Sequence, residues 1–127
     1  MSFDWGEYLS VAEELCSWPV SGPPAGTEAQ QRAAVSRAYY AGFILARNHL
    51  RDVDRVSIPH TGSAHLFVAQ RYASDPDLRR RQIGHLLRRL RSARNRCDYD
   101  DAVPHLPMLA AMSLMHAEQI VADLARL

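Results

Sequence analysis

Apolar residues recur at three- and four-residue spacing along almost the whole chain, which is the pattern of amphipathic helices. The segments expected to be helical are about 4–18, 27–50, 61–73, 76–97 and 107–127. No segment shows the strict alternation of a half-buried strand, and no internal repeat is present. The pattern therefore predicts an all-α bundle of four to five helices, forming a single domain over residues 1–127.

Residues that begin or end helices set the bounds of the first two segments. Asp4 is expected to cap the first helix, which Pro19 and the Gly22-Pro23-Pro24 cluster then end. Thr27 and Gln30 have the spacing of a capping box, in which each side chain satisfies a free backbone N–H of the other residue. We expect the second helix to begin there and to end near residue 50.

The second segment is apolar over more than half of its surface, so we expect it to lie at the centre of the bundle. The fourth is expected to start at Asp75-Pro76, an N-cap followed by proline at the first helical position, and to end before an acidic loop over 98–104. The apolar residues expected to face the core are Trp5, Tyr8, Leu9, Ala12, Leu15, Cys16, Ala34, Ala38, Tyr39, Phe43, Leu45, Ala46, Leu50, Leu66, Phe67, Val68, Leu78, Ile83, Leu86, Leu87, Leu90, Ala93, Cys97, Leu109, Met112, Met115, Ile120 and Leu124.

Composition narrows the class of protein. With 127 residues, 47% of them apolar, the chain has the size and the apolar content of one globular domain. No apolar run approaches the ~18 residues that span a bilayer, and the start Met1-Ser2-Phe3-Asp4 lacks the basic region of a signal peptide. Cys16 and Cys97 have no metal-ligand spacing, and no other metal motif is present. We therefore expect a cytoplasmic protein with free thiols, no membrane contact and no cofactor.

The net charge of +1 hides a strong asymmetry. All 15 basic residues are Arg, and eight of them lie between positions 79 and 96, where no acid occurs. The rest of the chain has seven Arg against 14 acids. Such a cluster is most often a solvated helix face. Two functional alternatives stay open: a track for RNA phosphates, or a docking face for an acidic partner, either an antitoxin or another copy of the chain.

One arginine interrupts the apolar stripe of the fourth segment. After Leu90, the next inward position is Arg94, where an unpaired guanidinium would be costly. Asp98 lies one turn later, with the spacing of a helical ion pair, and Asn95 and Tyr99 are adjacent. The group is either an ion pair that closes the helix end or a polar site for chemistry or phosphate binding, since the Arg fork matches phosphate geometry.

Two segments resemble the signatures of one protein family. Ser36-Arg37-Ala38-Tyr39-Tyr40-Ala41 is similar to the "SRAYYA" signature of small bacterial HEPN (higher eukaryote and prokaryote nucleotide-binding) proteins. Leu90-Arg91 and Arg94-Asn95-Arg96-Cys97-Asp98-Tyr99-Asp100 resemble their "LR..RN.ADYD" signature. The resemblance covers essentially the whole chain, including Ile83-Gly84. It implies a HEPN-like helical bundle that forms a homodimer.

The resemblance also implies an activity. Many members of this family are metal-independent ribonucleases that act as toxins in toxin–antitoxin or defence modules, often beside a nucleotidyltransferase-like antitoxin. Their catalytic pattern is Arg, four to six residues, then His. Here Arg94-Asn95 matches its start, but Tyr99 stands where the His is expected. Tyrosine is a poor general base at neutral pH, so Tyr99 would instead donate a hydrogen bond or a proton.

On this interpretation the catalytic residues are Arg94, which holds the phosphate, Asn95, which orients it, Asp98, which fixes Arg94, and Tyr99. The residues expected to bind RNA or phosphate are Arg37, Tyr40, Arg91 and Arg96. The alternative is a non-catalytic HEPN binding module that pairs with a nucleotidyltransferase-like antitoxin or another effector. Other Arg and His pairs with the required spacing are Arg55 and His60, Arg79 and His85, and Arg80 and His85; His49, His65 and His116 are expected at core or boundary positions.

Overall fold

The computed structural model describes residues 2–18 and 24–127, and within them every regular element is helical. The predicted all-α architecture is therefore confirmed. The predicted helix breakers Pro19, Gly22 and Pro23 lie outside the described residues. The helices of the described residues are α1 (Glu7–Leu15), α2 (Glu28–Asp52), α3 (Ala64–Ala73), α4 (Leu78–Tyr99) and α5 (Leu106–Leu124).

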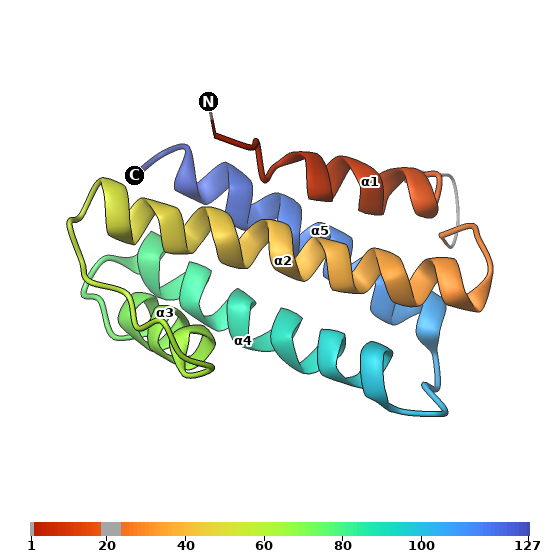
Figure 1. Cartoon of the computed structure of the whole chain (residues 1–127). Coiled ribbons are helices and arrows are strands. Elements are labelled where there is room, and N and C mark those ends of the chain that lie inside the picture. The colour runs from red at the N-terminus through yellow and green to blue at the C-terminus, as the bar shows by residue number, and fades with distance from the viewer. Residues whose placement is uncertain (1, 19–23) are drawn as a thin grey trace.

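Four of these helices form an up-and-down bundle (Figure 1). Along the chain, α1, α2, α4 and α5 alternate in direction, and the short α3 lies beside α4 near the C-terminal end of α2. The central position predicted for the second helix is confirmed, because α2 contacts all four other helices. Residues of α2 can therefore meet side chains from any other part of the bundle.

The capping box predicted at the start of α2 is confirmed. Thr27 Oγ1 accepts a hydrogen bond from the Gln30 backbone N–H at 3.2 Å, and Gln30 Oε1 accepts one from the Thr27 N–H at 2.8 Å. These contacts satisfy donors that have no partner inside the helix. At the other end, α2 continues to Asp52 instead of ending near residue 50.

The predicted starts of α1 and α4 are wrong by a few residues, because each predicted cap closes a turn before the helix. Asp4 Oδ1 accepts from the Gly6 N–H at 2.9 Å, and α1 begins only at Glu7. Asp75 Oδ1 likewise accepts from the Asp77 N–H at 2.8 Å, and Asp77 itself caps α4 by accepting from the Arg80 N–H at 2.9 Å. The other predicted bounds shift similarly: α1 ends at Leu15, α3 begins at Ala64, α4 runs on to Tyr99, and α5 spans Leu106–Leu124.

Arg32 of α2 makes hydrogen bonds to the C-terminal end of α4 and to the residues that follow it. Its guanidinium donates to the carbonyl oxygens of Cys97 at 2.9 Å, Asp100 at 2.6 Å and Asp101 at 3.0 Å. The last carbonyls of a helix have no partner inside it and carry the negative end of its dipole, so a cation that bonds them is stabilising. The contact stabilises the end of α4, where residues 98 and 99 are helical and do not belong to the predicted loop.

Most of the predicted core is buried, but four of its residues are exposed, namely Leu66, Leu78, Met112 and Met115. Leu78 is the first residue of α4 and precedes the part that contacts the core. The other three lie on the outer sides of α3 and α5. The buried residues of these two helices include Val68 and Ile120, which were predicted, and Ala69, Tyr72, Ala110, Leu114 and Ala117, which were not.

A glycine sets the close approach of α3 and α4. A Cβ added to Gly84 would lie 2.3 Å from the backbone nitrogen of Ala73 and 2.7 Å from the carbonyl oxygen of Ala69. No side chain fits this position without moving one of the helices. Gly84 therefore permits the crossing that holds α3 against the N-terminal half of α4.

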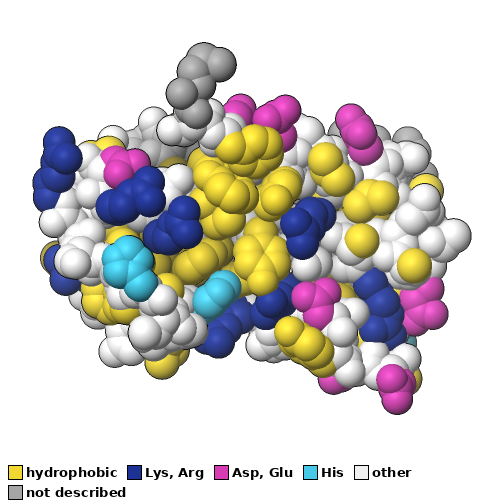
Figure 2. Space-filling view, viewed as in Figure 1, with side chains coloured by type: hydrophobic (Ala, Val, Ile, Leu, Met, Phe, Trp, Pro, Cys, Tyr) yellow, Lys and Arg dark blue, Asp and Glu magenta, His cyan; other side chains and the backbone are white. Residues whose placement is uncertain are grey.

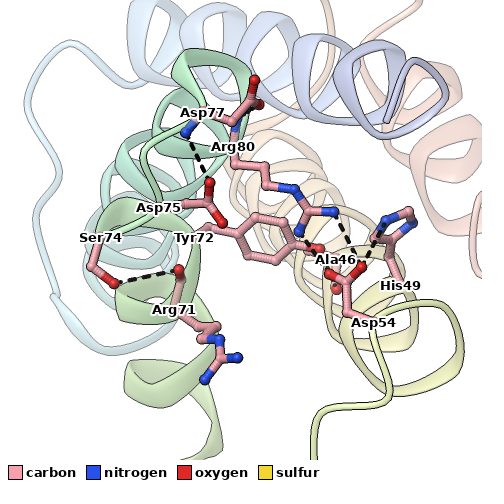
Figure 3. A network of polar contacts seen from close by, with 9 residues as sticks. All are labelled: Ala46, His49, Asp54, Arg71, Tyr72, Ser74, Asp75, Asp77 and Arg80. Atoms are coloured by element: carbon pink, nitrogen blue, oxygen red, sulfur yellow. Dashed lines mark hydrogen bonds and ion pairs between the residues drawn. The ribbon is translucent and has the colours of Figure 1, made fainter.

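A polar network ties the end of α2 to α3 and α4 (Figure 3). Arg80 binds Asp54 through both carboxylate oxygens, at 2.6 and 3.2 Å, and the Tyr72 hydroxyl donates to the Ala46 carbonyl at 2.7 Å. The hydrogen bond from Arg80 is the main cause that lowers the pKa of the Asp54 carboxyl below its ordinary value. His49 Nε2 lies 3.9 Å from the same carboxylate. The network fixes α3 relative to α4 and occupies Arg80, one of the arginines that could have paired with His85.

Cys16 and Cys97 are both free and buried, as predicted. Burial raises the pKa of both thiols, that of Cys97 to about 11.

Among the helices of residues 2–18 and 24–127, none is long and apolar enough to cross a lipid bilayer.

Candidate functional site

Arg94 lies on the inner side of α4, with a side chain only 16% exposed. Its Nε is 3.0 Å from Asp98 Oδ2, so the predicted ion pair one turn apart is present. Its Nη1 donates to Asn95 Oδ1 at 2.8 Å. The predicted neighbours Asn95 and Asp98 thus hold two edges of the guanidinium.

The third edge is held by a residue from the other signature segment. Arg94 Nη2 donates a hydrogen bond to the hydroxyl of Tyr40 in α2, and its Cζ lies 5.1 Å from the centre of the Tyr40 ring. Ser36, also in α2, donates through Oγ to Asp98 Oδ2 at 3.3 Å. The fold therefore brings the two signature segments together at one place, as a shared site requires.

Tyr99 forms the outer edge of this group. Its ring centre lies 5.8 Å from Arg94 Cζ, within range of a cation–π contact, yet the residue is 73% exposed. Its side chain is thus accessible to a ligand that approaches the guanidinium. We refer to Arg94, Asn95, Asp98, Tyr99 and Tyr40 as the Arg94 cluster.

Arg37 and Arg91 flank the Arg94 cluster without an acidic partner among the described residues. Arg37 lies over two aromatic rings, with Cζ 4.9 Å from the centre of Tyr8 and 5.4 Å from that of Tyr40. Arg91 is half-buried and is near enough to His65 to lower its pKa. Both arginines therefore lie beside the Arg94 cluster.

Arg96 is not part of the same group. It lines a groove between α4 and α5 together with Arg89, Leu109 and Met112. Residues two positions apart on a helix point to nearly opposite sides, so Arg96 cannot share the inner side with Arg94. Of the residues predicted to bind phosphate, the structure gathers Arg37, Tyr40 and Arg91 but leaves Arg96 on another surface.

A histidine from α3 reaches this region, which the sequence did not indicate. His65 Nδ1 forms a hydrogen bond with the hydroxyl of Tyr39, and its ring centre lies 6.3 Å from that of Tyr40. Burial is the largest cause that lowers the pKa of His65, and the charges of Arg91 and Arg94 lower it further. These causes all favour the neutral form of the imidazole. The position predicted for it, at the boundary of the core, is correct, but no spacing in the sequence linked it to Arg94.

The electrostatics of the region favour an anion. Arg37, Arg91 and Arg94 contribute three positive charges, Asp98 contributes one negative charge, and His65 is neutral. Guanidinium groups in a partly buried setting bind phosphate well, and a neutral imidazole can accept a proton. Within the described part of the chain, no group of three or more His, Cys, Asp or Glu side chains could hold a metal ion.

Comparison with known proteins returned no match: no family model, no curated protein and no solved structure is significantly similar to this chain. The resemblance to HEPN proteins therefore depends on the two signature segments of the sequence alone.

Proposed function

We propose that this chain is a HEPN-like protein that binds RNA at the Arg94 cluster and cleaves it without a metal ion. The observation that carries the proposal is the convergence of three helices: Arg94 from α4 bonds Tyr40 from α2, and His65 from α3 lies against Tyr40. A cation for the phosphate and a neutral base are thus present together. In the family motif the catalytic His follows the Arg on the same helix. Here His65 of α3 takes the role of that His.

The proposed reaction needs only acid–base chemistry. His65 accepts the proton of a ribose 2′-hydroxyl, whose oxygen bonds to the adjacent phosphorus while the bond from phosphorus to the 5′-oxygen breaks. Tyr99 gives its proton to the leaving 5′-oxygen and regains one from the protonated His65 through solvent. Arg94 and Arg91 stabilise the charge on the phosphoryl oxygens. The products are a 2′,3′-cyclic phosphate and a 5′-hydroxyl end.

A cleavage assay tests this proposal. The full chain is incubated with a fluorescently labelled single-stranded RNA in excess EDTA, and the ends of any products are identified. We expect cyclic phosphate ends with the wild type and their loss in Arg94→Gln and His65→Asn. The matched control is Arg88→Gln, an exposed arginine on the same helix, which should cleave normally. If the wild type binds the RNA but leaves it intact, the cleavage proposal is wrong and only the proposal of RNA binding is kept.

A second candidate, a non-catalytic interaction module, is favoured by the surface of α4 and α5. The groove between these helices has a volume of about 280 Å³, and Met108, Met112 and Met115 form an exposed stripe beside it. Residues 79–96 contain no acid, and residues 106–117 contain no Asp, Glu or Arg. Adaptable methionines beside a row of arginines suit an amphipathic helix with acidic flanks, such as an antitoxin could present.

A symmetric pairing of two copies through this groove is a poor fit, because their arginine rows would repel each other. The test uses two synthetic helical peptides that share an apolar face and differ only in Glu or Lys flanks. We expect the Glu peptide alone to bind, and Met112→Ser to weaken it about tenfold. The control is Leu66→Ser, an exposed apolar residue on α3. Equal binding of both peptides would contradict this second function.

A further inference from the structure

A cavity of about 360 Å³ lies between the C-terminal half of α2 and the segment 58–65. Arg47 and Arg51 of α2 line it from one side, and His60 and His65 line it from the other. Arg and His side chains lie beside hydrophobic ones on the face seen in Figure 2. The cavity is separate from the Arg94 cluster, although His65 contacts both.

Arg47 is the unusual residue of this cavity. Its side chain is half-buried, and its Nε and Nη2 both donate to Oδ1 of Asn48, a neutral amide, at 3.1 and 3.0 Å. Burial is the main cause that lowers the pKa of Arg47, and the charge of Arg51 lowers it further. Asp52 opposes this effect, but its two oxygens bind Arg51 at 2.8 and 3.1 Å. Arg47 is thus a partly desolvated cation with no carboxylate in contact among residues 2–18 and 24–127, and a bound anion would stabilise it.

Part of the cavity wall is apolar. Ile58 and Pro59 line it and are half-buried, and Phe43 stacks on the His65 ring with centres 4.2 Å apart. A volume of this size suits a small molecule and excludes a folded partner. A ligand that fits has an anionic end for the arginines and a flat or apolar body for the opposite wall.

We propose that this cavity binds a small organic phosphate monoester, with the phosphate held by Arg47, Arg51 and His60 and the organic group against Ile58 and Pro59. A phosphate accepts several hydrogen bonds at once, and it can take those that Arg47 and Arg51 do not give to Asn48 and Asp52. None of these five contact residues has a part in the proposed RNA cleavage, so the two proposals can fail independently. The phosphate ester is either a free metabolite or the 5′-phosphate end of an RNA.

Calorimetric titration of the full chain tests the proposal. The probes are phenyl phosphate, inorganic phosphate, AMP and a short RNA with or without a 5′-phosphate. We expect phenyl phosphate to bind at least about fivefold more tightly than inorganic phosphate, and Arg47→Gln to weaken it about tenfold. Arg71→Gln is the matched control, because Arg71 is exposed on α3 and outside this cavity. Thermal unfolding of each variant shows that it is folded.

The different probes distinguish a free metabolite from the 5′ end of an RNA as the source of the phosphate. Tight binding of AMP and phenyl phosphate that survives Arg94→Gln supports a site for a free metabolite. Binding of the 5′-phosphorylated RNA alone, lost in Arg47→Gln but kept in Arg94→Gln, supports a site for an RNA end. No saturable binding of any phosphate probe to the folded wild type, or equal binding by Arg47→Gln, overturns the proposal.

Discussion

Arg94 of α4 and Tyr40 of α2 are 54 positions apart in the sequence and share a hydrogen bond between guanidinium and phenol. Each belongs to a different signature segment. The contact turns two short motifs into one site and also ties together the two longest helices of the described structure.

Removal of the Tyr40 hydroxyl should weaken this connection. We expect Tyr40→Phe to lower the free energy of unfolding by about 1 kcal/mol, since the Arg94 donor loses a partly buried acceptor. Tyr99→Phe should change it by less than about 0.5 kcal/mol, because Tyr99 is exposed. Urea denaturation followed by circular dichroism measures both values. Equal effects of the two substitutions would show that the bond to Tyr40 does not stabilise the fold.

Arg32 should control the order of the end of α4. Arg32→Met keeps the aliphatic stem but loses three hydrogen bonds to carbonyl oxygens, so we expect a loss of about 2 kcal/mol. Amide hydrogen exchange over residues 98–101 should become faster, while exchange in α1 stays the same. Arg88→Met, an exposed substitution on α4, is the control. Unchanged exchange at 98–101 in Arg32→Met would contradict this account.

Gly84 should tolerate no side chain. The Cβ of Gly84→Ala would lie 2.3 Å from a backbone atom of α3, and backbone cannot move aside as a flexible side chain can. We expect a loss of about 2–3 kcal/mol in unfolding free energy, within the range of overpacked cores. Gly62→Ala is the control, because nothing lies within 4 Å of its added Cβ. A melting temperature in Gly84→Ala equal to that of the wild type would disprove the close crossing.

The Asp54–Arg80 pair predicts a loss of stability at low pH. The pKa of Asp54 is lowered in the folded state, so its contribution is present above the ordinary pKa of 3.8 and is lost as pH falls through the folded value. Asp54→Asn should therefore cost about 2 kcal/mol at pH 7, and the difference from the wild type should shrink below pH 4. Unfolding measured from pH 3 to 7 tests this. A difference that is constant over this range would exclude the ion pair as its cause.

Glu13 and Glu118 predict the opposite dependence on pH. Burial first, and then the hydrogen bond and charge of Glu118, raise the pKa of Glu13 from 4.5 to about 7. The folded state holds a proton that the unfolded state releases above 4.5, so stability falls between these values and is constant above 7. Glu13→Gln should remove this slope and stabilise the protein at pH 8 by about 1 kcal/mol, a value reduced by solvent screening. Glu14→Gln, on the exposed side of α1, is the control and should keep the slope.

The parts of the fold that depend on local physical chemistry could be predicted from the sequence. Helical periodicity and the Thr27–Gln30 capping box depend on residues within one or two turns, and both are present as expected. The start of α4 was misplaced because Asp75 and Asp77 both have the chemistry of a cap, and only the surrounding structure selects between them. Met112 and Met115 were misplaced because small residues let α5 approach α2 on a different side.

The candidate site likewise has one part that local sequence spacing predicts and another part that depends on the fold. The sequence by itself determined the ion pair of Arg94 with Asp98, because residues four apart on a helix are neighbours whatever the fold. Only the tertiary structure decided that Tyr40 bonds Arg94 and that His65 lies beside the arginines. These contacts join helices far apart along the chain, and their geometry follows from how the helices cross, which no local spacing encodes.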